Sequence, residues 1–391
     1  MTDPISASLE HRRFRAGRAF ELVVFDRLSP EEQVLLHELR ADPELFGLLR
    51  PRPDSGRTMR AVNRGTALLW LTLQTEGPLP FFVWEGDAEA ARRGIADLVL
   101  DGVLEVEDQG QFVCGAAALR LFEAGPPTAR GGRLAQLTRT ALRYAETLPF
   151  ADAGTLAGRL YAYGRLPVTP AWDARTPHPS ATLDFLGAGV NTATGRRLAA
   201  QWTHQEPSAA SAWIAWSRSS RRTFRSGTGI HKLYVSPLPE ALPHVFATLV
   251  DVLSGHGDVQ FKIGGDASGL LRPDKLVAYL PDLDSLQDVA ARLGERLAGA
   301  PAHGVPFTAA ITPDGLLSWG MDPPPSERML AWQDPESWRL WVVRRVAALM
   351  VAGRTEAGAD VPSWEFALAR LRRDGVDVDS WTPNAALWRA A

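Results

Sequence analysis

Apolar positions at helical spacing alternate with polar turns over residues 25–120 of this 391-residue chain. Ser29, Pro30 and Glu32 predict the start of a helix, because a serine cap, a proline in the first turn and a glutamate three residues after the serine all favour helix initiation. Two further helices and a short hairpin follow in the pattern. The helices are expected at residues 66–75 and 87–102, and the hairpin at 103–113 with its turn at 108–110. Three helices followed by a two-stranded wing are typical of a winged-helix domain.

The third of these helices is the one that would enter the major groove of DNA. It carries four acidic side chains against Arg92 and Arg93. The acidic residues are Asp87, Glu89, Asp97 and Asp101. Because an acidic helix repels phosphate, DNA binding is disfavoured. Over residues 25–120 the arrangement resembles the PqqD-like recognition elements of ribosomal-peptide biosynthesis, which implies a leader peptide that adds as a strand to the wing edge. A purely structural domain remains an alternative interpretation, as does DNA binding.

The pattern changes after residue 125. Residues 126–225 are rich in glycine, proline, alanine and arginine, with helices expected at 132–146 and 181–201 and an extended, proline-rich connector at 167–179. From residue 230 on, strands alternate with helices, a hairpin turns near residues 313–315, and the C-terminal stretch looks helical. We therefore expect an α+β protein. Its three expected parts are a winged-helix-like domain (1–125), a mostly helical connector (126–225) and an α/β domain with C-terminal helices (226–391).

Charge and composition exclude several classes of function. The formal net charge of −3 at pH 7 gives no general attraction to nucleic acid or to an acidic membrane. The polar start of the chain has no secretory signal, and the apolar stretch at 341–351 is too short to cross a bilayer, so a cytoplasmic protein is expected. A single cysteine, Cys114, can form neither an internal disulfide nor a cysteine-rich zinc cluster. Walker A, GxSxG, HExxH and dinucleotide-binding motifs do not occur.

Lysine is nearly missing from the chain. Of 42 basic residues only Lys232, Lys262 and Lys275 are lysines, and they lie within one short interval. An arginine stays protonated near neutral pH, whereas a lysine becomes a neutral amine once burial or a nearby cation lowers its pKa from about 10.4. The distribution therefore suggests a site that needs an amine. Chance clustering of surface lysines is the alternative.

Strand alternation assigns these lysines to faces of the predicted strands. Lys232 shares a face with Tyr234, and Lys275 shares a face with Tyr279. Lys262 projects to the face opposite that of its apolar neighbours Phe261 and Ile263. A glycine-containing loop with Arg272 lies between the second and third strands. If the faces converge, they form a cationic pocket with two phenols, which suits a phosphate group and can keep one amine neutral by repulsion from the others.

The residues occur in ordered motifs. These are His231-Lys-Leu-Tyr-Val-Ser236, Phe261-Lys262, Arg272-Pro-Asp-Lys-Leu-Val-Ala-Tyr279, Gly304-Val-Pro-Phe307 and Asp314-Gly-Leu-Leu-Ser-Trp-Gly320. In order and spacing they resemble the phosphothreonine lyase superfamily. That superfamily includes type III effector lyases, the lyase domains of lanthipeptide synthetases and Hop-type effector relatives. The resemblance implies a lyase-like C-terminal α/β domain that eliminates phosphate from phosphoserine or phosphothreonine in a peptide, without any metal or organic cofactor.

The resemblance also implies roles for individual residues. Lys262 would remove the α-proton, and Lys232 would stabilise the enolate-like charge that develops. Arg272 would bind phosphate, with Lys275 and Tyr279 beside it. The family has histidine as the acid at the position of Tyr234, and a phenol with a pKa near 10 is a poorer acid than imidazole at pH 7.

The implied partners are a precursor peptide and a separate peptide kinase, because the chain has no kinase motif of its own. The competing hypothesis is a catalytically silent protein that presents a precursor peptide to another modifying enzyme.

Overall fold

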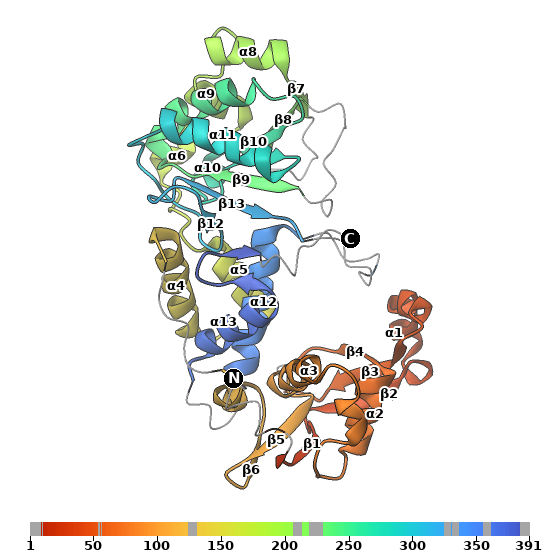
Figure 1. Cartoon of the computed structure of the whole chain (residues 1–391). Helices are drawn as coiled ribbons and strands as arrows, with labels where there is room; N and C mark the ends of the chain where they lie inside the picture. The colour runs from red at the N-terminus through yellow and green to blue at the C-terminus, as the bar shows by residue number, and fades with distance from the viewer. Residues whose placement is uncertain are drawn as a thin grey trace.

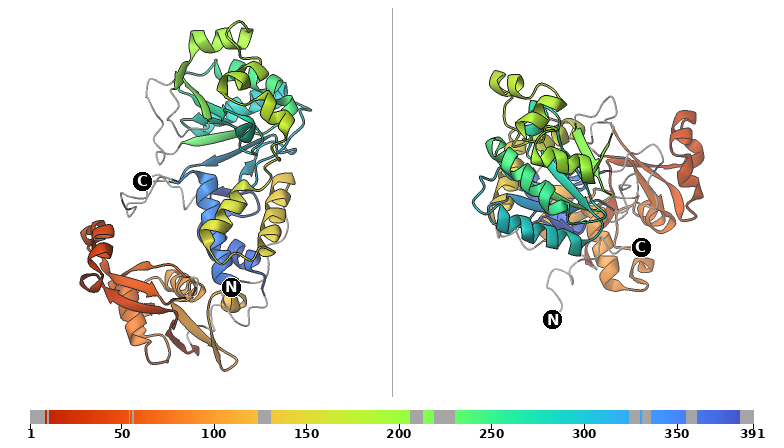
Figure 2. Two further views of the ribbon diagram at one scale, coloured as in Figure 1. Left: turned by 180° about the vertical axis from the view of Figure 1, so that it is seen from behind. Right: turned by 90° about the horizontal axis from the view of Figure 1, so that it is seen from above.

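The structure is a computed structural model, and it confirms the expected α+β class. It describes residues 9, 11–53, 55, 57–123, 131–205, 213–218, 230–323, 330, 336–354 and 361–383. Figures 1 and 2 show the N-terminal part at one end, a group of helices next to it, and a large sheet with its own helices at the other end.

The N-terminal part contains two three-stranded sheets, with the orders β1-β5-β6 and β2-β3-β4. The strands are β1 (Phe14–Ala16), β2 (Phe20–Val24), β3 (Leu45–Pro51), β4 (Arg60–Asn63), β5 (Leu104–Asp108) and β6 (Gln111–Val113). The predicted hairpin is confirmed: β5 pairs with β6 through a turn in which Gln109 and Gly110 both have positive φ. The first four strands were not predicted, because they are short and show no sustained alternation.

The predicted helices of this part occur. They are α1 (Pro30–Leu35), α2 (Arg64–Thr72) and α3 (Ala88–Leu100). α1 begins with the expected capping box at Ser29, yet none of its residues is buried, because it lies in an excursion between β2 and β3. The helix predicted at Ser29–Glu32 is thus confirmed, but its apolar side chains do not enter the core of this part. A 3-10 helix, η4 (Phe81–Trp84), stands between α2 and α3.

Helix α3 packs against helix α13 (Ser363–Arg373) through charge as well as apolar contact. Arg370 of α13 forms ion pairs of 2.7 Å with Asp97 and 2.9 Å with Asp101, and Arg373 forms another of 2.7 Å with Asp97. Leu100 joins Phe366 in a small buried cluster beneath these pairs. The acidic side chains that count against DNA binding are thus partly neutralised by α13.

The helices of the middle of the chain differ in two places from the prediction. α4 (Arg133–Glu146) is confirmed, but the long helix expected at 181–201 is two helices, α7 (Pro179–Phe185) and α8 (Ala193–Gln201). The break follows from Gly187, whose positive φ of 66° terminates α7. The proline-rich connector also contains a helix, α6 (Pro170–Arg175), which Thr169 caps.

Helices α4, α5 (Ala153–Ala162), α12 (Trp338–Arg354) and α13 share one core. Trp338 and Trp341, at the start of α12, are part of this core. No helix in the described part of the chain is long and apolar enough to cross a membrane.

The third part is a seven-stranded sheet with the order β12-β13-β9-β11-β10-β8-β7, in which every neighbouring pair is antiparallel. The strands are β7 (Thr203–Gln205), β8 (Trp213–Ser217), β9 (His231–Val235), β10 (Gln260–Gly264), β11 (Leu276–Leu280), β12 (Ala309–Ala310) and β13 (Leu317–Met321). Two helices, α9 (Leu242–Leu253) and α11 (Leu283–Arg296), share a large apolar core with this sheet. The expected boundary at residue 225 falls between β8 and β9, which belong to the same sheet.

Candidate active site

Strand register brings four of the six candidate residues onto one face of the sheet, and Lys275, which directly precedes β11, continues the alternation on that face. Lys232 on β9 lies opposite Tyr279 on β11, while Tyr234 and Lys262 both lie opposite Val277. Directly opposed residues share a face and side chains alternate along a strand, so all four project to the same side. Alternate residues of the same strands, such as Leu233 and Phe261, belong to the core formed with α9 and α11.

Two lysine amines lie over one phenol ring. The Nζ atom of Lys232 is 5.2 Å from the centroid of the Tyr279 ring, and the Nζ atom of Lys262 is 5.6 Å from it. Lys262 also lies 4.4 Å from the centroid of Trp213. Burial, together with the positive charge of Lys232, lowers the pKa of Lys262 to about 8. A substantial fraction of this amine is therefore neutral at mildly alkaline pH.

Lys232 forms an ion pair with a carboxylate. Its Nζ atom lies 2.7 Å from Oδ2 of Asp322, and both side chains are almost fully buried. Oδ1 of Asp322 accepts a hydrogen bond of 3.0 Å from the backbone N–H of Trp338 at the start of α12. This carboxylate therefore fixes the position of the Lys232 amine beside Tyr279. No carboxylate among the described residues forms an ion pair with Lys262.

Gly320 shapes the space around Lys232. It lies directly opposite Lys232 in the pairing of β13 with β9. A Cβ atom at this position would collide with the ring of Trp338. Asp322, two residues further along, reaches Lys232 from the end of the same strand. The glycine therefore lets α12 approach the face that carries the lysines.

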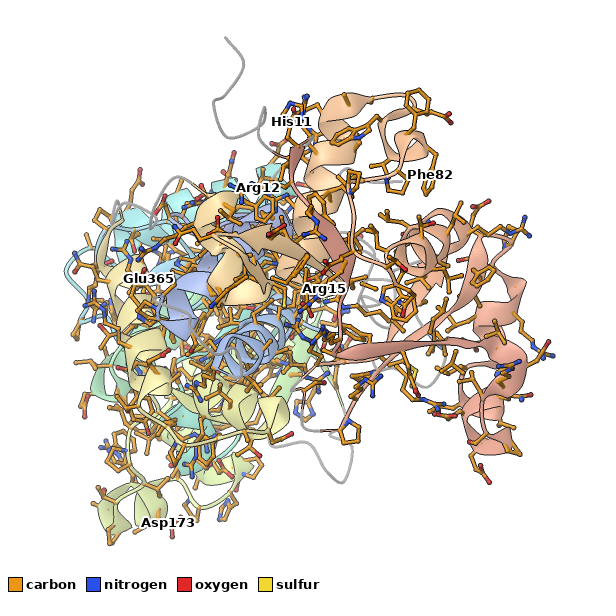
Figure 3. All side chains as sticks on the ribbon, turned by 90° about the horizontal axis from the view of Figure 1, so that it is seen from below. His11, Arg12, Arg15, Phe82, Asp173 and Glu365 are labelled. Atoms are coloured by element: carbon orange, nitrogen blue, oxygen red, sulfur yellow. The ribbon has the colours of Figure 1, made fainter. Side chains whose placement is uncertain are left out.

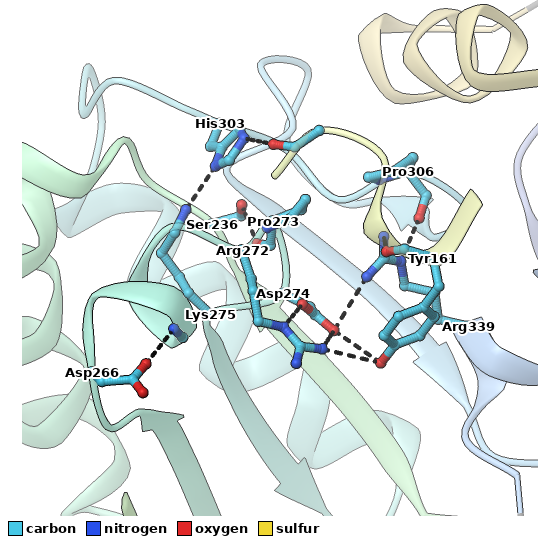
Figure 4. A network of polar contacts seen from close by, with 12 residues as sticks. Tyr161, Ser236, Asp266, Arg272, Pro273, Asp274, Lys275, His303, Pro306 and Arg339 are labelled. Carbon is cyan, nitrogen blue, oxygen red and sulfur yellow. Dashed lines mark hydrogen bonds and ion pairs between the residues drawn. The ribbon is translucent and has the colours of Figure 1, made fainter. Parts of the chain in front are cut away.

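Arg272 belongs to a charged network between the sheet and the helices (Figure 4). Its Nε and Nη2 atoms donate to the two oxygens of Asp274, at 2.8 and 2.9 Å. Asp274 also accepts from the hydroxyl of Tyr161 on α5 at 3.1 Å and lies 3.2 Å from Arg339 on α12. Burial alone would raise the pKa of Asp274, but Arg339 and Arg272 outweigh burial and hold that pKa well below its usual range.

The bidentate pair with Asp274 orients Arg272 without using all of its donors. Its guanidinium lies 5.0 Å from the centroid of Trp213, the ring that Lys262 also contacts. Nη1 of Arg272 donates to no residue in the described ranges. Arg272 and Lys262 therefore both lie over the ring of Trp213, and the N–H groups of Arg272 that do not bind Asp274 can bind an anion.

Lys275 shares the strand face but not the surroundings of Tyr279. Its Nζ atom donates to the carbonyl of Pro237 at 2.8 Å and lies 2.8 Å from Nδ1 of His303. Nε2 of His303 in turn lies 2.7 Å from the carbonyl of Gly164 (Figure 4). Because a carbonyl can only accept, Nε2 of His303 carries the proton and Nδ1 accepts from the lysine. This geometry favours a structural role for Lys275 over the phosphate contact that the resemblance implies.

Tyr234 is the remaining candidate. It packs with Val277, Val305 and Tyr279 and is only 4% exposed. Burial, with Asp322 adding to the effect, raises its pKa well above the usual value. Burial likewise raises the pKa of Tyr279 far above the usual range. Both phenols therefore stay protonated and can donate hydrogen bonds, but they give up a proton reluctantly.

Sequence reasoning missed several members of this site. They are Tyr161, Trp213, Asp274, Asp322 and Arg339. Alternation along β13 predicts that Asp322 shares a face with Ser318 and Gly320. It does not predict that Asp322 lies beside Lys232, because a single sequence does not show which strands pair. Tyr161 and Arg339 come from helices far away in the chain. Among the described residues, no cluster of three or more possible metal ligands occurs.

The chain matches no family model and no curated protein sequence. Solved structures that are similar to part of it include two bacterial effector proteins. One is the effector protein from Pseudomonas syringae pv. tomato strain DC3000, with 13% identity, a TM-score of 0.40, and coverage of 64% of this chain and 97% of that one. The other is the effector protein from Pseudomonas syringae pv. syringae strain 61, with 16% identity, a TM-score of 0.35, and coverage of 64% and 99%. The chain thus has a distant structural similarity to bacterial effector proteins.

Proposed function

We propose that this chain is a phosphopeptide lyase of ribosomally synthesised, lanthipeptide-like peptide biosynthesis, which eliminates phosphate from phosphoserine or phosphothreonine to give dehydroamino acids. The observation that carries the proposal is that the two lysines around Tyr279 differ in ion pairing. Lys262 has no carboxylate partner among the described residues and a pKa lowered to about 8, whereas Lys232 is ion-paired with Asp322. Elimination needs one neutral amine and one fixed positive charge, and this pair supplies both.

The proposed reaction uses the groups as follows. The neutral amine of Lys262 takes the α-proton of the phosphorylated residue and becomes an ammonium group. The electron pair of the Cα–H bond forms the Cα=Cβ double bond, the Cβ–O bond breaks, and its electrons leave with the phosphate. The ammonium of Lys232 stabilises the negative charge that develops on the peptide carbonyl. The free N–H edge of Arg272 binds the phosphate, and the protonated phenol of Tyr234 is the candidate hydrogen-bond donor to the leaving oxygen.

The proposal includes a precursor peptide as partner, and a kinase must act before this protein because the substrate is already phosphorylated. The N-terminal part would bind the peptide rather than DNA. Helix α3, which would have to enter the major groove of DNA, is instead held against α13, where Asp97 and Asp101 are ion-paired with Arg370.

A second candidate function is a catalytically silent binder of the precursor peptide. The observation in its favour is Tyr234, whose pKa is raised well above the usual value where the resembling family has a histidine acid. In that case the site would bind a phosphorylated residue and leave it intact. The two candidates differ in whether phosphate is released.

The test uses the full-length protein, a chelator of metal ions and a degenerate phosphothreonine peptide library. We expect release of inorganic phosphate, measured colorimetrically, and peptides lighter by one phosphoric acid, measured by mass spectrometry. Release should rise with pH through about 8, because protonated Lys262 cannot act as a base and its neutral fraction grows across that pH. Bound but intact phosphopeptide at every pH would favour the silent binder and refute the lyase.

A further inference from the structure

A groove of about 720 Å³ lies in the N-terminal part, remote in sequence from the lysines of the sheet. Residues of β1, of β2 and of the end of α2 line it, together with the chain that follows β1 and β3. Phe20 and Trp70 contribute apolar surface, and both are at least nine-tenths buried. Figure 3 shows another lining residue, Arg15, among the side chains of this part. The volume lies within the range of ligand-binding clefts, roughly 300–1,000 Å³, and exceeds what a single small anion would fill.

Every carboxylate that lines the groove already has an arginine partner. Glu21 lies 3.6 Å from Arg50, and Glu76 is ion-paired with Arg13. The lining arginine of β1, Arg15, is likewise occupied, because its Nε atom donates to Glu105 at 2.7 Å. These pairs offset the charges of Glu21, Glu76 and Arg15.

Three hydrogen-bond donors of the lining remain without partners in the described part of the chain. The guanidinium groups of Arg18 and Arg52 are exposed and form no ion pair there. The indole Nε1 of Trp70 is buried and has no hydrogen-bond partner. Arg18 is held in place through its backbone, since its N–H donates to Glu105 at 3.0 Å. The three donors come from three separate segments of the chain.

We propose that this groove binds an acidic, extended segment of the peptide that the protein modifies, through carboxylates that pair with Arg18 and Arg52. This inference rests on the proposed function for its source of peptide. Two guanidinium groups that form no ion pair with a described residue and a buried N–H match carboxylates, and Phe20 and Trp70 match apolar side chains between them. A peptide held here raises the effective concentration of its phosphorylated residue at the lysines without any new contact in that site.

The test measures binding of a fluorescein-labelled decapeptide of alternating glutamate and leucine to the full-length protein by fluorescence anisotropy. The double variant Arg18→Gln with Arg52→Gln should weaken binding about tenfold, as expected for two lost charge-assisted hydrogen bonds. Trp70→Phe keeps a ring and removes the N–H, so it should weaken binding by a smaller factor. The matched control is Arg27→Gln with Arg64→Gln, which removes two exposed charges of the same part outside the groove and should leave the affinity unchanged.

Equal affinity of the two double variants would overturn the inference, and so would equal binding of the same peptide with glutamine in place of glutamate. A short DNA duplex or inorganic phosphate that displaces the peptide and depends more strongly on Arg18 and Arg52 would show that the groove binds another ligand. That result would overturn the inference as well. The proposed function fails separately. Phosphate release from a phosphopeptide without binding of the probe would refute only the peptide-binding groove. Binding of the probe without phosphate release would refute only the lyase activity.

Discussion

Two regions of one sheet face contain all three lysines of the protein, and they differ in what surrounds the amine. Burial lowers the pKa of Lys262 to about 8 in the region around Tyr279 and the pKa of Lys275 to about 7 in the region around His303. Lys275 is fully buried, and its amine donates to the carbonyl of Pro237 and lies 2.8 Å from Nδ1 of His303. The amine of Lys262 lies over the rings of Trp213 and Tyr279 and forms no hydrogen bond or ion pair with a described residue. A lowered pKa alone therefore does not identify a base. The amine must also lack permanent hydrogen-bond partners and be reachable by a substrate.

The region around Lys275 connects structural segments. His303 joins the lysine to the carbonyl of Gly164, in the chain just beyond α5, and Ser236 donates to the carbonyl of Pro273 at 2.6 Å close by. Burial, and then the charge of Lys275, lowers the pKa of His303 to about 4, so the imidazole is neutral at pH 7. The contrast predicts that changes around Tyr279 affect chemistry and that changes around Lys275 affect folding.

The largest effect is expected for Lys262→Arg. Arginine keeps the positive charge and much of the reach but offers no neutral amine, so the base is lost while attraction for phosphate survives. Phosphate release should fall by about 10³-fold, the typical contribution of a general base. Binding of the phosphopeptide, measured by calorimetry, should stay within a few-fold of the parent. Release at the parental rate would show that the comparison assigns the base to the wrong lysine.

A smaller effect is expected for Asp322→Asn. The amide keeps the shape and can still accept from the N–H of Trp338, but it removes the charge that pairs with Lys232. Loss of a hydrogen-bond donor to the negative charge of the transition state lowers the rate about 10²–10³-fold. Asp322→Asn leaves the donor, the amine of Lys232, in place but removes its ion-pair partner, so kcat should fall only about tenfold.

The KM for phosphopeptide should change little in Asp322→Asn, because Arg272 still binds phosphate. Asp251→Asn is the control, since it breaks an ion pair with Arg296 on the α9 and α11 side of the sheet. That control should leave kcat unchanged. A rise in KM with unchanged kcat in Asp322→Asn would mean that Asp322 supports substrate binding and not the charge on Lys232.

The sequence was sufficient for the strands that carry the lysines, because apolar alternation around Lys232 and Lys262 sets their faces once a strand is assumed. It was not sufficient for the pairing between strands. Nothing local indicates that β11 lies between β9 and β10, and this order is what brings both amines to Tyr279.

A helix signal predicts the structure where it stands alone, as Ser29 followed by Pro30 does at the start of α1. The same arrangement of Thr169 and Pro170 starts α6, but it lies among prolines whose number favours an extended connector. The network around Asp274 was beyond prediction for another reason. Its members approach one another only when α5 and α12 pack near the sheet.

The smallest effect on phosphate release, less than about threefold, is expected for Lys275→Met, which removes an amine but keeps an apolar side chain of similar length. The effect should appear in stability instead, because the carbonyl of Pro237 and Nδ1 of His303 lose their donor, and a buried group left unpaired costs about 1–3 kcal/mol. Burial lowers the pKa of Lys275 from 10.5 in the unfolded chain to about 7 in the folded protein. Between these pH values the unfolded chain binds a proton that the folded protein does not, so the parent gains stability as pH rises through this window. The variant has no such group. The difference in free energy of unfolding between parent and variant, measured with urea, should therefore grow by about 1.4 kcal/mol per pH unit from pH 7 to 9 and level off below pH 7. A difference that is constant with pH, or a loss of phosphate release as large as that of Lys262→Arg, would remove the distinction between the two regions.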